Sequence, residues 1–141
     1  MTMRSTITVI GLFLLCAISI SSVSAHHSYL LTVQQLHAGL TKAPSLSEKG
    51  FILIDVRSPE EHAIGFIPGT DLNIEFREIQ ARHRDIGARL DDHLVVYCQS
   101  GHRSNIAAET LADLGYRHVY NVTGSMNAWV AAGLPVESAP R

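Results

Sequence analysis

Two short runs without a single polar residue, 51–54 and 94–97, constrain the fold more than any other feature of the chain. A strand of this kind must be covered on both faces, which is typical of the parallel sheets of α/β proteins. A third run, 119–122, has the same strand-like character. Between the runs, hydrophobic residues recur at helical spacing, as at Ala107, Leu111 and Leu114. The pattern therefore predicts strands that alternate with helices.

The expected helix ends carry the residues that usually cap helices. Thr32 and Gln35 have the spacing of a capping box ahead of a helical pattern that runs to Leu40. Gly115 is expected to end the helix of Ala107 to Leu114, and Ser125 to cap a last helix that holds the core residue Trp129. Residues 76–90 also show helical spacing, although Gly87 interrupts it. We expect one α/β domain with a parallel sheet and helices on both faces.

Cys98 stands where the run 94–97 ends, at the carboxyl end of a predicted strand. Ligands of parallel sheets bind at these strand ends. A short loop with Gly101 follows, and a helix is expected to start near Arg103. Backbone amides of residues 99–103, the positive end of that helix and the Arg103 guanidinium would all favour a thiolate. Cys98 is thus the predicted nucleophile, rather than an inert core cysteine.

Residues 1–25 have the pattern of a signal peptide. Arg4 precedes an apolar stretch at 7–20, which is short for a membrane span, and Val23, Ser24 and Ala25 form a small-residue cleavage signal. The domain is then expected at 26–141, with 10 basic and 13 acidic residues and a formal charge of −3. Cleavage removes Cys16 and leaves Cys98 as the one cysteine, in a periplasmic or secreted protein. An uncleaved N-terminal anchor is the alternative.

Several ordered motifs between residues 32 and 136 resemble those of the rhodanese-like family. The similarity rests on the stretches Asp55-Val56-Arg57, Gly65-Phe66-Ile67-Pro68-Gly69, Val95-Val96-Tyr97-Cys98, Arg103-Ser104, Leu114-Gly115 and Gly133-Leu134-Pro135. Phe66 stands where the family usually has histidine, and Ser125 where it often has a second glycine; we expect both departures to affect structure rather than activity. The resemblance implies a central parallel five-stranded sheet flanked by helices.

The resemblance also implies transfer of sulfane sulfur through a cysteine persulfide. On that basis the chain is expected to be a sulfurtransferase of the thiosulfate type, with a small anionic sulfur donor and cyanide or a thiol as acceptor. Cys98 is the expected catalytic residue, and Gln99, Ser100, Gly101, His102 and Arg103 are the expected substrate-binding residues. Neither a cofactor nor a metal is expected, since the eight histidines are scattered through the sequence.

Other functions are weighed against this one. Cysteine phosphatases have five residues between cysteine and arginine, whereas four lie between Cys98 and Arg103, so the loop suits a sulfur atom better than a phosphoryl group. A sulfur carrier or thiol-redox module that serves one protein partner is the main alternative.

Asp55 and Arg57 are expected to be structural, with Asp55 binding loop amides and Arg57 pairing with Glu60 or Glu61. No basic run suggests nucleic acid. The donor and the oligomeric state stay open.

Overall fold

The computed structural model describes residues 28–42 and 49–140. The predicted signal peptide 1–25, its cleavage site and Cys16 lie outside the described residues. In chain order the elements are β1 (Ser28–Leu31), α1 (Val33–Lys42), β2 (Phe51–Asp55), α3 (Pro59–Ile64), β3 (Leu72–Asn73), η1 (Phe76–Glu78), α4 (Ile79–Arg82), η2 (His83–Ile86), β4 (His93–Tyr97), α5 (His102–Asp113), β5 (His118–Val122) and α6 (Ser125–Ala131).

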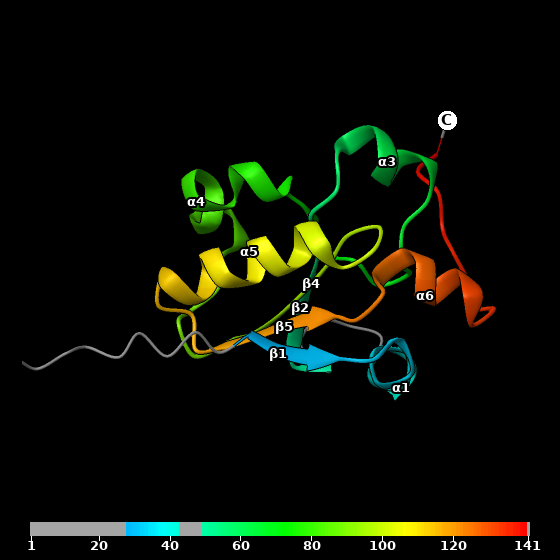
Figure 1. Cartoon of the computed structure of the whole chain (residues 1–141), viewed down its shortest axis with the longest axis horizontal. Coiled ribbons are helices and arrows are strands. Elements are labelled where there is room, and N and C mark those ends of the chain that lie inside the picture. Colours follow the sequence, from blue (N-terminus) through cyan, green and yellow to red (C-terminus); the bar gives the residue numbers. More distant parts are fainter. Residues whose placement is uncertain (1–27, 43–48, 141) are drawn as a thin grey trace, which may run out of the picture.

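The strands form one five-stranded sheet in the order β1-β5-β4-β2-β3, and every neighbouring pair is parallel. β4 is the central strand (Figure 1). Asp55, the last residue of β2, lies opposite Tyr97, the last residue of β4. The residues that follow these two strands therefore emerge together at one edge of the sheet.

Helices cover both faces of the sheet, as expected (Figure 1). On one face, Ile79 of α4 and Leu111 of α5 belong to a buried cluster with alternate residues of the central strands. On the other, Leu36 of α1 and Trp129 of α6 pack on the opposite set of strand residues. The strands 51–54 and 94–97 are apolar throughout because both of their faces are buried. The α/β class and the parallel five-stranded sheet are confirmed.

The predicted capping box of α1 is present in the structure. The Thr32 Oγ1 accepts a hydrogen bond from the Gln35 amide at 3.1 Å, and the Thr32 amide donates to Gln35 Oε1 at 2.9 Å. This reciprocal pair satisfies amides that the first turn of a helix leaves without partners. Gly115, with a φ of 100°, ends α5 as predicted. Trp129 is 1% exposed and is the core anchor expected of it.

The structure differs from the sequence-based expectation in three respects. The helical pattern of 76–90 is not one helix but the short segments η1, α4 and η2, and Gly87, with a φ of 69°, ends the last of them. The edge strands β1 and β3 were not predicted; β3 has only two residues. Ser125 does not cap α6: Gly124 is the N-cap residue, and the Ser125 hydroxyl bonds elsewhere.

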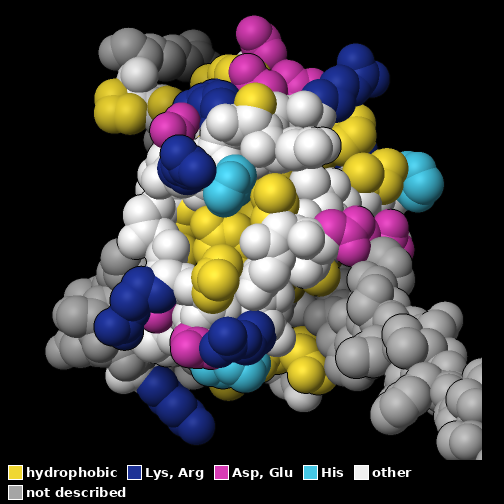
Figure 2. Space-filling view, turned by 90° about the vertical axis from the view of Figure 1, so that its left-hand side faces the viewer, with side chains coloured by type: hydrophobic (Ala, Val, Ile, Leu, Met, Phe, Trp, Pro, Cys, Tyr) yellow, Lys and Arg dark blue, Asp and Glu magenta, His cyan; other side chains and the backbone are white. Residues whose placement is uncertain are grey.

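The opposite end of the molecule, where the strands begin, differs in character from the Cys98 end. Lys and Arg side chains alternate with Asp and Glu around a small hydrophobic area on this face (Figure 2).

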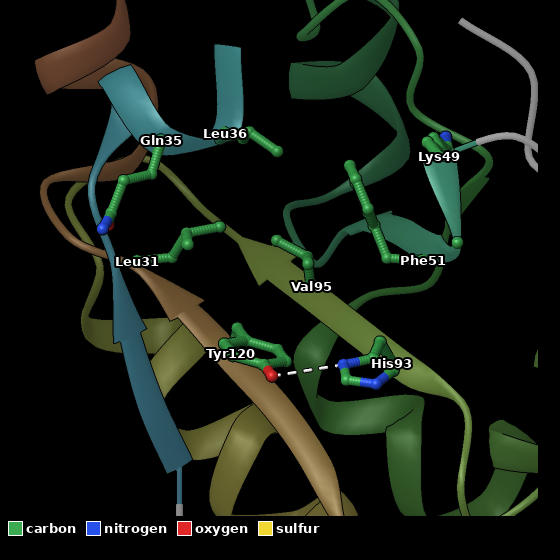
Figure 3. A pocket seen from close by; sticks show the side chains of 9 residues that line it. Leu31, Gln35, Leu36, Lys49, Phe51, His93, Val95 and Tyr120 are labelled. Carbon is green, nitrogen blue, oxygen red and sulfur yellow. Dashed lines mark hydrogen bonds between the residues drawn. The ribbon is translucent and has the colours of Figure 1, made fainter. Parts of the chain in front are cut away.

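A hollow of about 340 Å³ lies between α1 and the sheet, and its lining includes Leu36, Phe51 and Tyr120. His93, the first residue of β4, binds the Tyr120 hydroxyl through Nδ1 at 3.1 Å (Figure 3). None of the predicted site residues lines this hollow.

Within residues 28–42 and 49–140, no helix combines the length and hydrophobicity required to cross a membrane.

Candidate active site

Cys98 lies directly after β4, at the carboxyl end of the central strand. The residue is buried, with 1% of its surface exposed. Its Sγ accepts hydrogen bonds from the Gly101 amide at 3.0 Å and from the Ser104 hydroxyl at 3.3 Å. Gly101 adopts a φ of 103°, a conformation that favours glycine, and it leads directly into α5. The loop thus folds back over the sulfur of the residue that precedes it.

Hydrogen bonds to the sulfur favour the thiolate form of Cys98. Burial on its own would raise the pKa of the thiol, because a thiolate is poorly solvated in the interior. The Ser104 hydroxyl and the amides of Ser104, Gly101 and Ser100 act in the opposite direction, and their combined effect lowers the pKa below its usual value. Of the amides 99–103 that the sequence predicted in this role, those of Ser100 and Gly101 contribute, and Ser104 is an additional donor outside the predicted range.

The start of α6 is hydrogen-bonded to the backbone of Cys98. The Cys98 amide donates to the Ser125 Oγ at 3.1 Å, and the same hydroxyl donates to the Val122 carbonyl at 2.9 Å. The Met126 amide donates to the Cys98 carbonyl at 3.1 Å. Ser125 is fully buried and has a φ of 47°, the one non-glycine residue with a positive φ in the described part of the chain. The α6 start is therefore part of the site.

Asn121 of β5 links the loop to the Ser104 side chain. Its Nδ2 donates to the Gly101 carbonyl at 3.2 Å, and its Oδ1 lies 2.6 Å from the Ser104 Oγ, whose single proton is shared between this oxygen and the Cys98 sulfur. Asn121 is 5% exposed and interrupts an otherwise apolar strand. Sequence reasoning missed Ser104, Asn121 and Ser125 as supports of the loop. A polar residue inside the strand pattern of 119–122 was the signal that would have drawn attention to Asn121.

The predicted substrate-binding residues differ in exposure and in hydrogen bonding. Ser100 and His102 are exposed. Gln99 is held on both sides: its Nε2 donates to Asn127 Oδ1 at 2.6 Å, and its Oε1 accepts a long hydrogen bond from Arg57 Nη1 at 3.4 Å. Gly101 contributes its amide to the sulfur rather than a side chain. The loop therefore presents mainly backbone and two exposed side chains to the solvent.

Arg103 points its guanidinium at Glu61 of α3. Its Nη1 and Nη2 donate to the two carboxylate oxygens at 2.7 and 2.8 Å, in a bidentate ion pair. The hydrogen bond from Arg103 is the main cause that lowers the pKa of Glu61 to about 2. The sequence predicted that the Arg103 guanidinium would stabilise the Cys98 thiolate, but in the structure it is already paired with the Glu61 carboxylate. Glu61 was not predicted to bind Arg103.

Asp55 and Arg57 form a second, buried ion pair beside the loop. The Arg57 Nη2 lies 2.6 Å from Asp55 Oδ2, and both side chains are at most 4% exposed. Asp55 Oδ1 also accepts the Arg57 amide at 3.0 Å, which confirms its predicted role in binding loop amides. The predicted pairing of Arg57 with Glu60 or Glu61 is wrong: Arg57 folds back onto Asp55 and donates to the Gly65 carbonyl at 2.6 Å.

No cluster of three or more His, Cys, Asp or Glu side chains suited to a metal ion occurs among the residues that the structure describes. The site consists of a buried, hydrogen-bonded thiol at the end of the central strand of a parallel α/β sheet. Such a site is suited to chemistry at a thiolate.

The model of the rhodanese-like domain matches residues 32–132, and the chain belongs to this family. It is 39% identical to a sulfurtransferase of Allochromatium vinosum over 85 residues, which cover 60% of this chain and 77% of the relative. It is 33% identical to the thiosulfate sulfurtransferase GlpE of Pseudomonas fluorescens, over 70% of this chain and 86% of the relative. These relatives support the assignment of this chain to the sulfurtransferases.

Solved structures show the same fold. A rhodanese with anions from E. coli superposes with a TM-score of 0.55 at 30% identity and covers 63% of this chain and 99% of its own. A rhodanese-related protein from Thermoplasma volcanium superposes with a TM-score of 0.65 at 27% identity, over 79% of this chain and 99% of its own.

Proposed function

We propose that the protein transfers sulfane sulfur from thiosulfate or a similar donor to a thiophilic acceptor, cyanide or a thiol, through a persulfide on Cys98. The environment of the Cys98 sulfur is the observation that supports the proposal. The thiol is buried, has a lowered pKa, and accepts hydrogen bonds from the Gly101 amide and the Ser104 hydroxyl. A thiolate is the nucleophilic form of cysteine, so the lowered pKa of Cys98 increases the fraction of the reactive species relative to an ordinary thiol.

The two steps of the reaction balance without a cofactor. The Cys98 thiolate attacks the outer sulfur of thiosulfate; the new Sγ–S bond forms while the S–S bond of the donor breaks, and sulfite leaves with the electron pair. The persulfide anion keeps one negative charge. Cyanide then attacks the outer sulfur of the persulfide, leaves as thiocyanate and restores the thiolate. Since sulfur rests on the enzyme between two substrates, the kinetics should be ping-pong.

Donors of hydrogen bonds around the sulfur support both forms of this cycle. The Gly101 amide and the Ser104 hydroxyl stabilise a negative charge on the thiolate before the first step. After the first step the same donors would still bind Sγ, which is then the inner sulfur of the proposed persulfide. The exposed His102 and the amide of Ser100 are the groups we assign to contact the donor at the loop surface.

The test is mass spectrometry of the protein after treatment with thiosulfate. We expect one additional sulfur atom on Cys98, its loss on addition of cyanide, and no such adduct in Cys98→Ser. An unmodified Cys98, or thiocyanate formation that persists in Cys98→Ser, would exclude the proposal. Steady-state turnover with thiosulfate and cyanide separates an enzyme from a sulfur carrier, because a carrier that serves one protein partner forms the adduct but turns over little without it.

We also propose that the protein acts in the periplasm or is secreted, after cleavage of residues 1–25. Arg4, the apolar stretch 7–20 and the small residues before His26 support this proposal. Intact-mass measurement of the protein from the periplasmic fraction should give a chain that begins at His26. A chain that keeps residues 1–25 and sediments with membranes would show that the segment is an anchor.

A further inference from the structure

Both arginines that border the Cys98 loop are already neutralised within the fold. Arg57 forms its ion pair with Asp55 at 2.6 Å, and Arg103 forms its bidentate pair with Glu61 at 2.7 and 2.8 Å. The two guanidinium groups and the two carboxylates together carry no net charge. A donor that approaches the loop therefore meets no unpaired arginine, and His102 is the remaining ionisable side chain of the loop.

The Glu61 carboxylate is fixed in its place by the start of α3. The Ser58 amide donates to Glu61 Oε2 at 3.2 Å, while the Glu61 amide donates to the Ser58 Oγ at 3.3 Å. This is a capping box, and its glutamate lies in the first turn of the helix, where a negative charge is favourable. Glu61 is thus held ionised in front of Arg103 even when no substrate is bound.

The two charges of the Glu61–Arg103 pair act at the Cys98 loop, so the loss of either one would leave a net charge there. Arg103 belongs to the first turn of α5, which starts directly after the loop, and it interacts electrostatically with Cys98. Glu61 interacts electrostatically with Arg57 as well as with Arg103. About one third of each side chain of the pair is exposed, so both face the solvent from which the donor arrives.

We propose that Glu61 is a specificity-determining residue that favours donors of low charge, such as alkyl persulfides, over the thiosulfate dianion. The proposal rests on sulfur transfer through Cys98 and names the donor class of that site. Thiosulfate brings two negative charges toward a thiolate and toward an Arg103 cation that Glu61 neutralises. An alkyl persulfide brings at most one negative charge, so it loses less attraction than thiosulfate does when Glu61 neutralises Arg103.

The step with a persulfide donor is also balanced. The Cys98 thiolate attacks the outer sulfur of R–S–SH, the Sγ–S bond forms, and the S–S bond of the donor breaks. The thiolate R–S⁻ leaves with the electron pair, and the S–H proton stays on the sulfur that is now attached to Cys98. One negative charge is present before and after the step, and no oxidant or reductant is required. Cys98 is 1% exposed, and the transferable sulfur is a terminal atom in a persulfide as it is in thiosulfate, so access to the sulfur does not distinguish the two donors.

The test compares two donors, thiosulfate and cysteine persulfide, in single-turnover loading of Cys98 followed by mass spectrometry. Glu61→Gln removes one negative charge but keeps an oxygen that accepts from Ser58 and Arg103. We expect it to raise the second-order rate constant for thiosulfate by about fivefold at low ionic strength, chiefly through tighter donor binding. The rate constant for cysteine persulfide should change by less than roughly twofold, and the difference between donors should shrink in high salt.

Three further variants separate charge from structure. Glu60→Gln removes the neighbouring exposed carboxylate and should leave both rate constants unchanged, because Glu60 has no contact with Arg103 among the interactions described. Arg103→Gln should slow thiosulfate more than the persulfide. In the double variant Glu61→Gln/Arg103→Gln, residues 61 and 103 again carry no net charge, as in the wild type. Its preference between donors should therefore return to within about twofold of the wild type.

A Glu61→Gln variant in which both donors change equally, or in which thiosulfate slows, would overturn the role of Glu61. The same holds if Glu60→Gln has as large an effect. If wild-type Cys98 takes sulfur from neither donor, the proposed sulfur transfer itself fails, and this outcome is distinct from a loss of donor preference.

Discussion

The Ser125 hydroxyl accepts a hydrogen bond from the Cys98 amide at 3.1 Å, although 27 residues separate them in sequence. Ser125 also donates to the Val122 carbonyl and lies 3.4 Å from the Ser104 hydroxyl, which itself reaches the sulfur. The beginning of α6 and the beginning of α5 therefore meet at Cys98. This contact explains why a serine is kept at a φ of 47°, where most side chains are strained.

Ser125→Ala should destabilise the protein by about 1–3 kcal/mol, because it leaves the buried Cys98 amide without its partner and keeps the strained backbone. Ser125→Gly loses the same hydroxyl but relieves the positive φ, so it should cost less than Ser125→Ala. Urea unfolding followed by circular dichroism measures both. Equal stability of Ser125→Ala and the wild type would show that the hydroxyl contributes little.

Ser104→Ala should raise the pKa of Cys98, since the Ser104 hydroxyl is the side chain that donates to the sulfur. The rate of alkylation by iodoacetamide, measured against pH, reports the thiolate fraction, and its midpoint should move to higher pH. Thr110→Ala is a matched control on the same helix, because the Thr110 hydroxyl donates only to the Ile106 carbonyl among the bonds described. An unshifted profile in Ser104→Ala would contradict the assignment.

Asp55→Asn should destabilise the protein by about 3–5 kcal/mol, because it leaves the buried Arg57 guanidinium without a charged partner. The control is Asp91→Asn, which breaks the pair of Asp91 with Arg117 on the surface, where more than 60% of each side chain is exposed. That variant should cost less than about 1 kcal/mol. Comparable losses for the two variants in chemical denaturation would argue against a buried pair.

The Glu61–Arg103 pair should make a small, pH-dependent contribution to stability. The pKa of Glu61 is lowered to about 2 in the fold, against a value near ~4.3 in the unfolded chain. The contribution is therefore complete above that unfolded value and is lost as the pH falls toward 2. Since the pair is partly exposed, we expect less than about 1 kcal/mol. The difference in unfolding free energy between wild type and Glu61→Gln should shrink from pH 7 to pH 3; a difference that grows would show the opposite sign.

Local patterns in the sequence were sufficient to predict the class of fold and the position of the Cys98 thiol at a strand end. The apolar runs 51–54 and 94–97 predict buried parallel strands because each strand face must be covered, whatever covers it. Cys98, Gly101 and the helix that follows are neighbours in the chain, so their order alone predicts a thiol at a strand end beside helix amides. The Thr32–Gln35 capping box was predicted for the same reason, since both partners lie within one turn.

Only the tertiary structure decided which distant side chains complete the site. Ser125 and Asn121 reach the Cys98 loop because β5 lies beside β4 in the sheet, and no local pattern encodes that neighbour. The same holds for Arg103, whose partner Glu61 comes from a helix 42 residues earlier. Hydrogen bonds and ion pairs act over a few ångströms in space, irrespective of separation along the chain. The sequence alone therefore determined the strand, the loop and the thiol, whereas the packing of α3 and α6 against them decided which groups hold the loop and which charges surround it.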